Sequence, residues 1–94
     1  MDIFEVIISD HALHDLKKVP FHIFKKLQAW IEGVSYSGLR EMRKIPGYHD
    51  EPLHGKRIGQ RSIRLSKAYR AIYAIKHSGE IEIVMILEIN KHAY

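Results

Sequence analysis

Hydrophobic and polar residues alternate with a period of two from Gln60 onward, and this pattern constrains the fold more than any other feature. In the first run, Ile63 and Leu65 share one side of an extended chain and Arg64 lies on the other. In the second run, the tyrosines share one side and Arg70 lies on the other. The few residues between the runs fit a hairpin turn. The pattern therefore predicts two antiparallel strands that carry arginines at alternating positions.

Two further strands are predicted, one near each end of the chain. A tight turn at residues 77–79 precedes Glu80–Asn90, whose centre is apolar on both faces, as expected for a strand inside a sheet. Near the N-terminus, Asp2–Ile8 is rich in Ile, Val and Phe. It ends at Ser9 and Asp10, which are typical helix-capping residues.

Two helices are predicted between the first strand and the hairpin. Residues 11–18 have apolar positions spaced by three and four, and Pro20 ends this helix because it lacks an amide hydrogen. The second helix has the clearest helical period in the chain, and its apolar stripe consists of Ile23, Phe24, Leu27, Trp30, Ile31 and Val34. We expect this stripe, Trp30 included, to pack against a sheet. Ser37 is predicted to cap a short turn through Leu39–Lys44.

The order strand, helix, helix, strand, strand, strand predicts an α+β fold, with two N-terminal helices packed on a mainly antiparallel sheet. A chain of 94 residues can bury one modest core, so we expect a single domain over residues 1–94. No apolar run approaches the roughly 18 residues of a membrane span. The acidic start also lacks the Lys and Arg of a secretory signal, so the expected location is cytoplasmic. The absence of cysteine excludes disulfides, a thiolate nucleophile and cysteine zinc sites.

The basic charge is concentrated in one third of the chain. The net charge is +4, but residues 40–70 hold nine Lys or Arg against three acidic residues. A positive field concentrated in this way suits a polyanionic ligand, although a solvated basic face would give the same composition. This segment includes a loop, residues 45–59, with two prolines and three glycines. Long loops in small domains are often functional.

Several common kinds of site find no support in the sequence. His11 and His14 lie three apart on a predicted helix, but no third ligand follows at a spacing typical of zinc sites. Glycine-rich phosphate loops and a G-x-S-x-G nucleophile motif are absent. The acidic residues are too scattered to predict a glycosidase pair. We therefore expect neither a metal nor a cofactor.

The remaining candidates suit cleavage of RNA by its own 2′-hydroxyl. That reaction needs a proton acceptor for the hydroxyl, positive charge beside the pentavalent phosphorane and a proton donor for the departing 5′-oxygen. Imidazole, guanidinium and phenol groups can fill these roles, and a planar guanidinium grips two phosphate oxygens better than lysine does. The candidates are Arg64, Arg70, His92 and Tyr94, with His54, Lys56 and Arg57 in the loop.

Two segments resemble a known family. The run GQRSIRLSKAYRAIY at residues 59–73 and the terminal EINKHAY at residues 88–94 resemble the RelE/ParE superfamily of bacterial toxin-antitoxin toxins, and most closely its HigB-type members. The resemblance is specific over residues 51–94, whereas the N-terminal strand and helices match in order and length only. It implies a RelE-like α+β toxin that cleaves messenger RNA, commonly in the ribosomal A site, and that is neutralised by a small antitoxin.

The resemblance also implies roles for individual residues. Arg70 matches the arginine that stabilises the scissile phosphate, and Arg64 matches an RNA or phosphate contact. His92 matches a general base or acid, and Tyr94 a hydrogen-bonding or base-stacking partner. For Arg70, the alternative is a structural salt bridge to an acidic residue near or on the last strand, namely Glu80, Glu82 or Glu88.

The loop departs from the family pattern at one position. The segment Pro52–Gly55 matches a P-L-K-G motif in which His54 replaces the lysine. Either His54 takes over a proton-transfer role, or Lys56 or Arg57 supplies the missing charge. Glu51 stands where some relatives have a histidine, so the assignment of acid and base within this set stays open.

Other basic residues are expected to bind RNA through charge rather than to take part in the chemistry. This group consists of Lys56, Arg57, Arg61 and Lys91. The predicted partners are a cognate antitoxin, messenger RNA and the 30S or 70S ribosome. A higher-order toxin–antitoxin complex is compatible with these partners, and no membrane is expected.

Two alternatives from other functional classes share this sequence pattern. One is a ParE-like toxin that inhibits DNA gyrase without nuclease activity. The other is a non-catalytic RNA-binding module, whose binding would depend steeply on salt. ParE-like relatives generally lack the terminal His and Tyr, so His92 and Tyr94 favour the nuclease.

Overall fold

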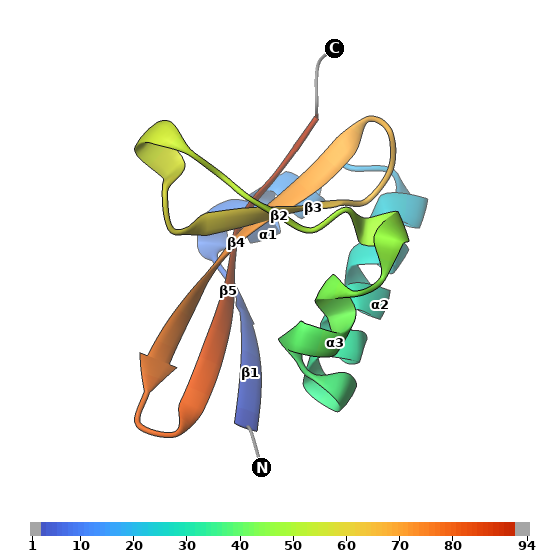
Figure 1. Ribbon diagram of the computed structural model, residues 1–94. Helices are drawn as coiled ribbons and strands as arrows, with labels where there is room; N and C mark the ends of the chain where they lie inside the picture. Colours follow the sequence, from blue (N-terminus) through green and yellow to red (C-terminus); the bar gives the residue numbers. More distant parts are fainter. Residues whose placement is uncertain (1–2, 92–94) are drawn as a thin grey trace.

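A mixed five-stranded sheet with helices on one face forms the framework of the computed structural model, which describes residues 3–91 (Figure 1). The strands are β1 (Ile3–Ile8), β2 (Glu51–Pro52), β3 (Gln60–Arg64), β4 (Tyr69–Ser78) and β5 (Ile81–Lys91). The helices are α1 (Asp10–Leu16), α2 (Phe21–Ser37) and α3 (Leu39–Arg43), and two 3₁₀ turns follow, η1 (Pro46–Tyr48) and η2 (Gly55–Arg57). Within the described residues, no helix is long and apolar enough to cross a membrane.

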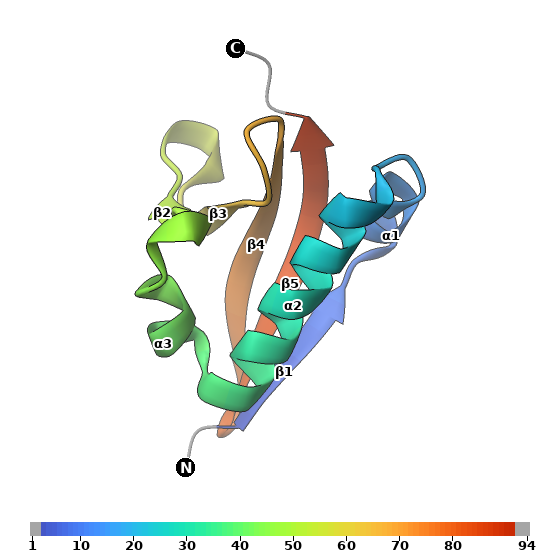
Figure 2. The same ribbon diagram turned by 90° about the vertical axis from the view of Figure 1, so that its right-hand side faces the viewer.

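The strands lie in the order β1-β5-β4-β3-β2. Strand β5 pairs in parallel with β1 and antiparallel with β4, so the prediction that the strand apolar on both faces is central is confirmed. The α+β fold is confirmed as well. The structure adds α3 and the two-residue strand β2 to the predicted order, and β4 extends through Ser78 into the predicted turn. Figure 2 shows α2 and α3 in front of the sheet.

The core lies between α2 and the sheet. Trp30 is fully buried and its ring is 5.1 Å from that of Tyr73 on β4, measured between centroids. The buried stripe of α2 consists of Ile23, Leu27, Trp30 and Val34, so the predicted packing of Trp30 is confirmed. The inclusion of Phe24 in the stripe was wrong: its side chain is 42% exposed and stacks on Phe21. Phe24 follows Ile23 by one position, about 100° around the helix, which turns it away from the sheet.

Helix α1 is capped by Ser9 and covers part of the edge of β5. The Ser9 hydroxyl accepts a hydrogen bond from the amide of Ala12 at 3.1 Å and donates one to the carbonyl of Leu87 at 3.0 Å. Further along, Asp15 accepts a hydrogen bond from the amide of Ile89 at 3.0 Å. These contacts satisfy backbone groups of β5 beyond the point where β1 ends.

Gly38 separates α2 from α3 and requires glycine. Its φ is 87° and its ψ is 161°, a region that other residues rarely adopt. A Cβ atom at this position would lie 2.9 Å from the ring of Phe4 on β1. The prediction that Ser37 caps the following turn was wrong, because Ser37 is the last residue of α2 and Gly38 precedes α3.

Gly38→Ala is therefore expected to lower the free energy of unfolding by roughly 1–3 kcal/mol, the cost of strained backbone at a glycine-only position. Urea denaturation followed by circular dichroism measures the change. The matched control is Gly47→Ala, because that position has no positive φ and a Cβ there has no neighbour within 4 Å. An equal loss of stability in both variants would contradict the role assigned to Gly38.

A β-bulge decides which side chains of β5 face the helices. Ile72 pairs with Glu88 and Tyr73 pairs with Ile86, so the extra residue on β5 interrupts the strict alternation. Val84, Ile86 and Ile89 are the buried members of the strand. Beyond the bulge, the even-numbered residues of β5 consequently share the face of Arg70 and Ile72, opposite α2.

Candidate functional site

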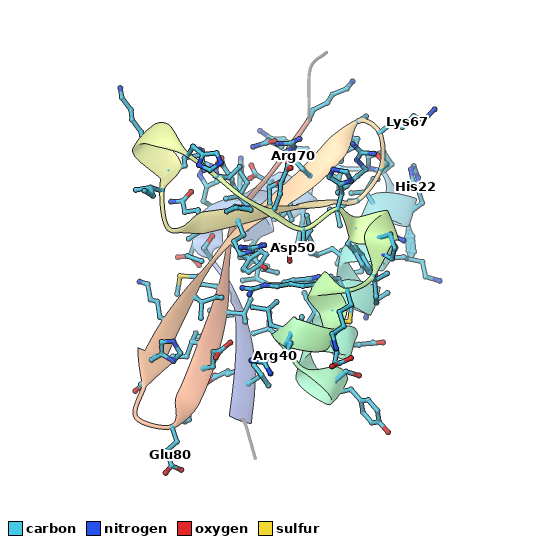
Figure 3. The ribbon with its side chains drawn as sticks, in the orientation of Figure 1. His22, Arg40, Asp50, Lys67, Arg70 and Glu80 are labelled. Carbon is cyan, nitrogen blue, oxygen red and sulfur yellow. The ribbon has the colours of Figure 1, made fainter. Side chains whose placement is uncertain are left out.

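Two arginines and an asparagine form a row across the face of the sheet opposite α2. Arg64 on β3 pairs with Arg70 on β4, and Arg70 pairs with Asn90 on β5. Paired residues on neighbouring antiparallel strands point to the same side of a sheet. Arg64 is exposed and Arg70 is partly buried. The row lies near the end of β5, where Asn90 precedes Lys91, the last residue described. Figure 3 labels Arg70 of this row.

Neither arginine of this row is neutralised within residues 3–91, where the structure shows no ion pair or side-chain hydrogen bond for Arg64 or Arg70. The alternative of a structural salt bridge between Arg70 and the last strand is therefore not observed. Glu82 pairs with His77 at the other end of the sheet, and Glu88 contacts Arg57. Among the described residues, the row is therefore a pair of neighbouring positive charges without an ion-pair partner.

The next row on this face carries two acidic residues, Glu51 and Glu88. It crosses the sheet from Ser62 through Ile72 to Glu88. Ile72 is only 4% exposed although it lies outside the main core cluster. Glu51 pairs with Ser62 and begins the row on β2. The candidate site therefore has arginines in one cross-strand row and carboxylates in the adjacent row.

The loop between β2 and β3 projects on the side away from α2 and α3 (Figure 1). His54 and Lys56 are both exposed and make no side-chain hydrogen bond or ion pair with the residues that the structure describes. Arg57 contacts Glu88 Oε1 through Nη2 and donates from Nη1 to Gln60 Oε1 at 2.9 Å. The loop thus offers an exposed imidazole and an exposed ammonium group, while the guanidinium of Arg57 is engaged within the fold.

Arg61 belongs to a different cluster, on the helix side of the sheet. Its Nε donates to Asp50 Oδ1 at 2.7 Å, and the side chain of Asp50 has no exposed surface. The Tyr73 hydroxyl donates to the other Asp50 oxygen at 2.6 Å. Burial alone would lower the pKa of Arg61, but the hydrogen bond to Asp50 and its negative charge outweigh this and raise it. The expected grouping of Arg61 with the RNA-binding side chains does not match this placement.

Two of the predicted catalytic residues, His92 and Tyr94, lie outside the described residues. Lys91, the last residue described, is exposed and pairs with Tyr69. Sequence reasoning missed Asn90 and Asp50, and it considered Glu88 only as a partner of Arg70. The sequence did not indicate which side of the sheet Glu88 and Asn90 face, because their orientation depends on the bulge.

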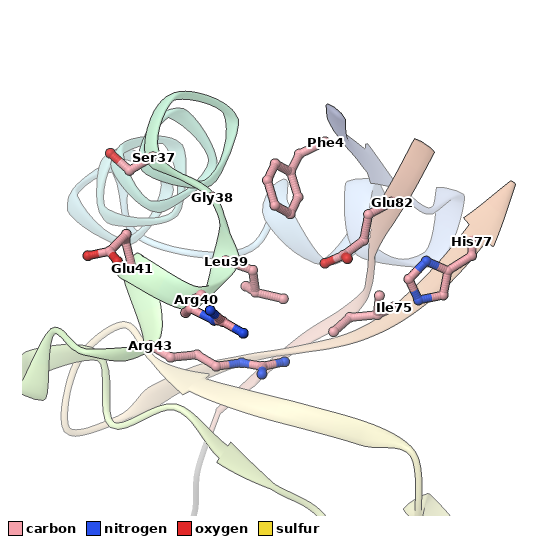
Figure 4. A pocket seen from close by; sticks show the side chains of 10 residues that line it. All are labelled: Phe4, Ser37, Gly38, Leu39, Arg40, Glu41, Arg43, Ile75, His77 and Glu82. Carbon is pink, nitrogen blue, oxygen red and sulfur yellow. The ribbon is translucent and has the colours of Figure 1, made fainter. Parts of the chain in front are cut away.

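A separate pocket lies at the other end of the sheet (Figure 4). It has a volume of about 490 Å³ and is lined by Phe4, Arg40, Glu41, Arg43, His77 and Glu82, among others. Its charges are of both signs, unlike those of the arginine row. Within the described residues, no group of three His, Asp or Glu side chains is placed to hold a metal ion.

Comparison with known proteins identifies the fold. No protein-family model matches the chain, and no curated protein matches it in sequence. Solved structures do match over nearly the whole chain. The YoeB/ParE toxin from Agrobacterium tumefaciens is 17% identical, with 95% of this chain and 99% of that one covered and a TM-score of 0.69. YafQ from E. coli strain BL21(DE3) is 16% identical, with 94% and 92% covered and a TM-score of 0.69.

A third structure, the toxin-antitoxin complex RelBE2 from Mycobacterium tuberculosis, is 22% identical to this chain, with 96% and 99% covered and a TM-score of 0.59. Identities this low establish similarity of fold. The chain therefore has the RelE-like fold, as the resemblance implied.

Proposed function

We propose that this protein is the toxin of a type II toxin-antitoxin system, of the HigB kind, and that it is a metal-independent endoribonuclease that cleaves messenger RNA on the ribosome. The observation that carries the proposal is the direct pairing of Arg64 with Arg70 on neighbouring strands. Like charges in this position destabilise a sheet by roughly 0.2–1 kcal/mol. An anion between or beside the two guanidiniums removes the repulsion, and a phosphodiester fits their planar forks.

The chemistry proposed at this site is attack of the RNA 2′-oxygen on the adjacent phosphorus. The base accepts the 2′-hydroxyl proton, the bond from phosphorus to the 5′-oxygen breaks, and the acid returns a proton to that oxygen. The products are a 2′,3′-cyclic phosphate and a 5′-hydroxyl. We assign stabilisation of the phosphorane to Arg70, the proton transfers to His92 and His54, and a stacking or hydrogen-bonding role to Tyr94.

Other basic residues have assignments in the same proposal. Arg64, Lys56 and Lys91 are exposed, and we assign them to contacts with RNA phosphates. Arg57 and Arg61 are engaged with carboxylates, so we assign them to the support of the fold. Each free Lys or Arg that binds a phosphate releases counterions, which makes the affinity for RNA dependent on salt.

An antitoxin is the proposed protein partner. Solved structures with this fold include the DinJ-YafQ toxin-antitoxin complex from E. coli and the YoeB-YefM complex from Staphylococcus aureus. We propose that a cognate antitoxin binds this chain as well, in a complex that can be of higher order. An acidic antitoxin segment would complement the basic loop and the arginine row. A cytoplasmic location, where messages and ribosomes are found, belongs to the same proposal.

Induced expression in a bacterium tests the proposed function. Wild type should arrest growth and create new 5′ ends on a translated reporter message, and the double variant His92→Gln/Tyr94→Phe should do neither. The same reporter with its start codon removed serves as the untranslated control. Growth arrest with DNA damage and intact message would instead support a gyrase-directed toxin. Binding to RNA without cleavage, unaffected by the double substitution, would support a non-catalytic RNA-binding module.

A further inference from the structure

We infer that Glu88 is a positioning residue that holds the loop of residues 53–59 against the arginine face of the sheet through Arg57. The inference rests on the proposed nuclease function, because it concerns how the loop that carries His54 and Lys56 is held on the face of the sheet that carries Arg70. Glu88 itself touches neither substrate nor reacting atoms in this role.

The contact between Glu88 and Arg57 joins the loop to the central strand β5. Glu88 Oε1 is shielded from solvent and accepts no hydrogen bond within the described residues, and it forms an ion pair with Arg57 Nη2. The side chain of Glu88 as a whole is 19% exposed. Arg57 is fixed at a second point by Gln60, which accepts from Nη1. A carboxylate buried in this way needs a cation, so the pair is costly to separate.

The loop has few other attachments. Its backbone hydrogen bonds are local: the amide of Leu53 donates to Gln60, that of Arg57 to His54, and that of Ile58 to Gly55. Ile58 is 80% exposed and adds no packing. Within the described residues, the side-chain ion pairs and hydrogen bonds of the loop are those of Arg57 alone. The connection from η2 to the central strand β5 therefore depends on Glu88.

The position of Glu88 suits this role better than a role as general base. One carboxylate oxygen is buried against Arg57, and the other lies 4.0 Å from His11 Nε2. A general base needs a free lone pair directed at the substrate. Glu88 instead lies one row from Arg70 on the same face. Its ion pair with Arg57 therefore ties the loop that carries His54 and Lys56 to that face.

The test compares wild type with Glu88→Gln, which keeps the size of the side chain and removes its charge. The charge-swapped variant Arg57→Glu/Glu88→Arg restores an ion pair with reversed charges. The control is Glu82→Gln, because Glu82 is a partly buried glutamate at the other end of the same strand. The first readout is amide hydrogen exchange at Leu53, Arg57 and Ile58. We expect at least about tenfold faster exchange in Glu88→Gln, wild-type rates in the control, and recovery in the swapped variant.

The second readout is single-turnover cleavage on programmed ribosomes at varied protein concentration. Glu88→Gln should lower the saturating rate by up to about 100-fold, with little change in the half-saturating concentration, because misplacement of groups by about 1 Å has effects of this size. The swapped variant should recover most of the rate. A merely structural defect would instead lower the fraction of active protein in both substituted variants alike.

The outcomes separate this inference from the proposed function. Unchanged exchange in Glu88→Gln overturns the inference whatever the cleavage rate. Faster exchange with an unchanged cleavage rate also overturns it, since the loop would then be held without consequence for the reaction. If wild type cleaves no RNA, the proposed function fails, and the exchange rates alone decide whether Glu88 holds the loop.

Discussion

Arg70→Ala should lower kcat/KM for RNA cleavage by about 10²–10³-fold while leaving the protein folded. The expected loss is that of a group that stabilises charge developing in the transition state. Arg70 has no ion pair within the described residues and faces Arg64, so its removal also relieves a repulsion, and the stability should not fall. Cleavage of a translated message by purified protein, together with a urea denaturation curve, measures both quantities.

Two further variants make this prediction specific. Arg70→Lys keeps the charge but loses the planar fork, so its activity should lie between wild type and Arg70→Ala. Arg40→Ala, an exposed arginine on α3 away from the row, should cleave at the wild-type rate. Wild-type cleavage by folded Arg70→Ala would remove the phosphate-stabilising role. An equal loss of activity in Arg40→Ala would point to general charge rather than to the row.

Asp50→Ala should have the largest effect on stability, a loss of about 3 kcal/mol in the free energy of unfolding. The substitution leaves the partly buried guanidinium of Arg61 and the hydroxyl of Tyr73 without their acceptor. Arg61 is 23% exposed, so water offsets part of the cost and the lower end of the usual range applies. The loss is a large fraction of the 5–15 kcal/mol typical of a domain. Urea denaturation measures it.

The matched control is the exposed pair of Lys44 and Glu41, whose charged atoms also lie close together, at 2.9 Å. Glu41→Ala should change the stability by less than about 1 kcal/mol, because both side chains are in water. A similar small effect of Asp50→Ala would show that the buried cluster contributes little.

The same cluster predicts a pH dependence through Tyr73. Burial, and then the hydrogen bond to Asp50, raise the pKa of Tyr73 well above its ordinary value of 10.0. The folded state keeps the phenolic proton at a pH where the unfolded chain releases it. The stabilisation is therefore present in full below pH 10 and is lost as the pH rises above it, at up to about 1.4 kcal/mol per pH unit. Between about pH 9 and pH 11, the free energy of unfolding of Tyr73→Phe should fall less steeply with pH than that of wild type. Equal slopes in the two proteins would contradict the role assigned to Tyr73.

Local chemistry in the sequence was sufficient to predict most of the elements. Ser9 caps α1 because its hydroxyl satisfies a free amide, and Pro20 separates the two helices because it has no amide to donate. The period of two placed Arg64 and Arg70 on the opposite side from Ile63 and the tyrosines, and the register of β3 and β4 confirms that placement. These features depend on neighbours within a few positions, so a sequence pattern records them.

The rest of the site depends on contacts between distant parts of the chain. Strict alternation along β5 would put Glu88 on the side of Ile86, and the bulge reverses this by inserting one residue opposite β4. No local pattern marked that insertion, because the strand is apolar on both faces. The pairing of Arg57 with Glu88 follows from the bulge and from the path of the loop.

The sequence by itself determined the α+β class, the helix packed by Trp30 and the alternation that presents Arg64 and Arg70, because these follow from periodicity and local propensity. Only the tertiary structure decided that Asp50 holds Arg61 and Tyr73 inside the fold and that Glu88 faces the arginine side. The physical reason is that the neighbouring groups in the folded structure decide whether a charged side chain faces solvent, binds a substrate or pairs with another residue. In this chain the partners of Asp50 are 11 and 23 positions away in sequence.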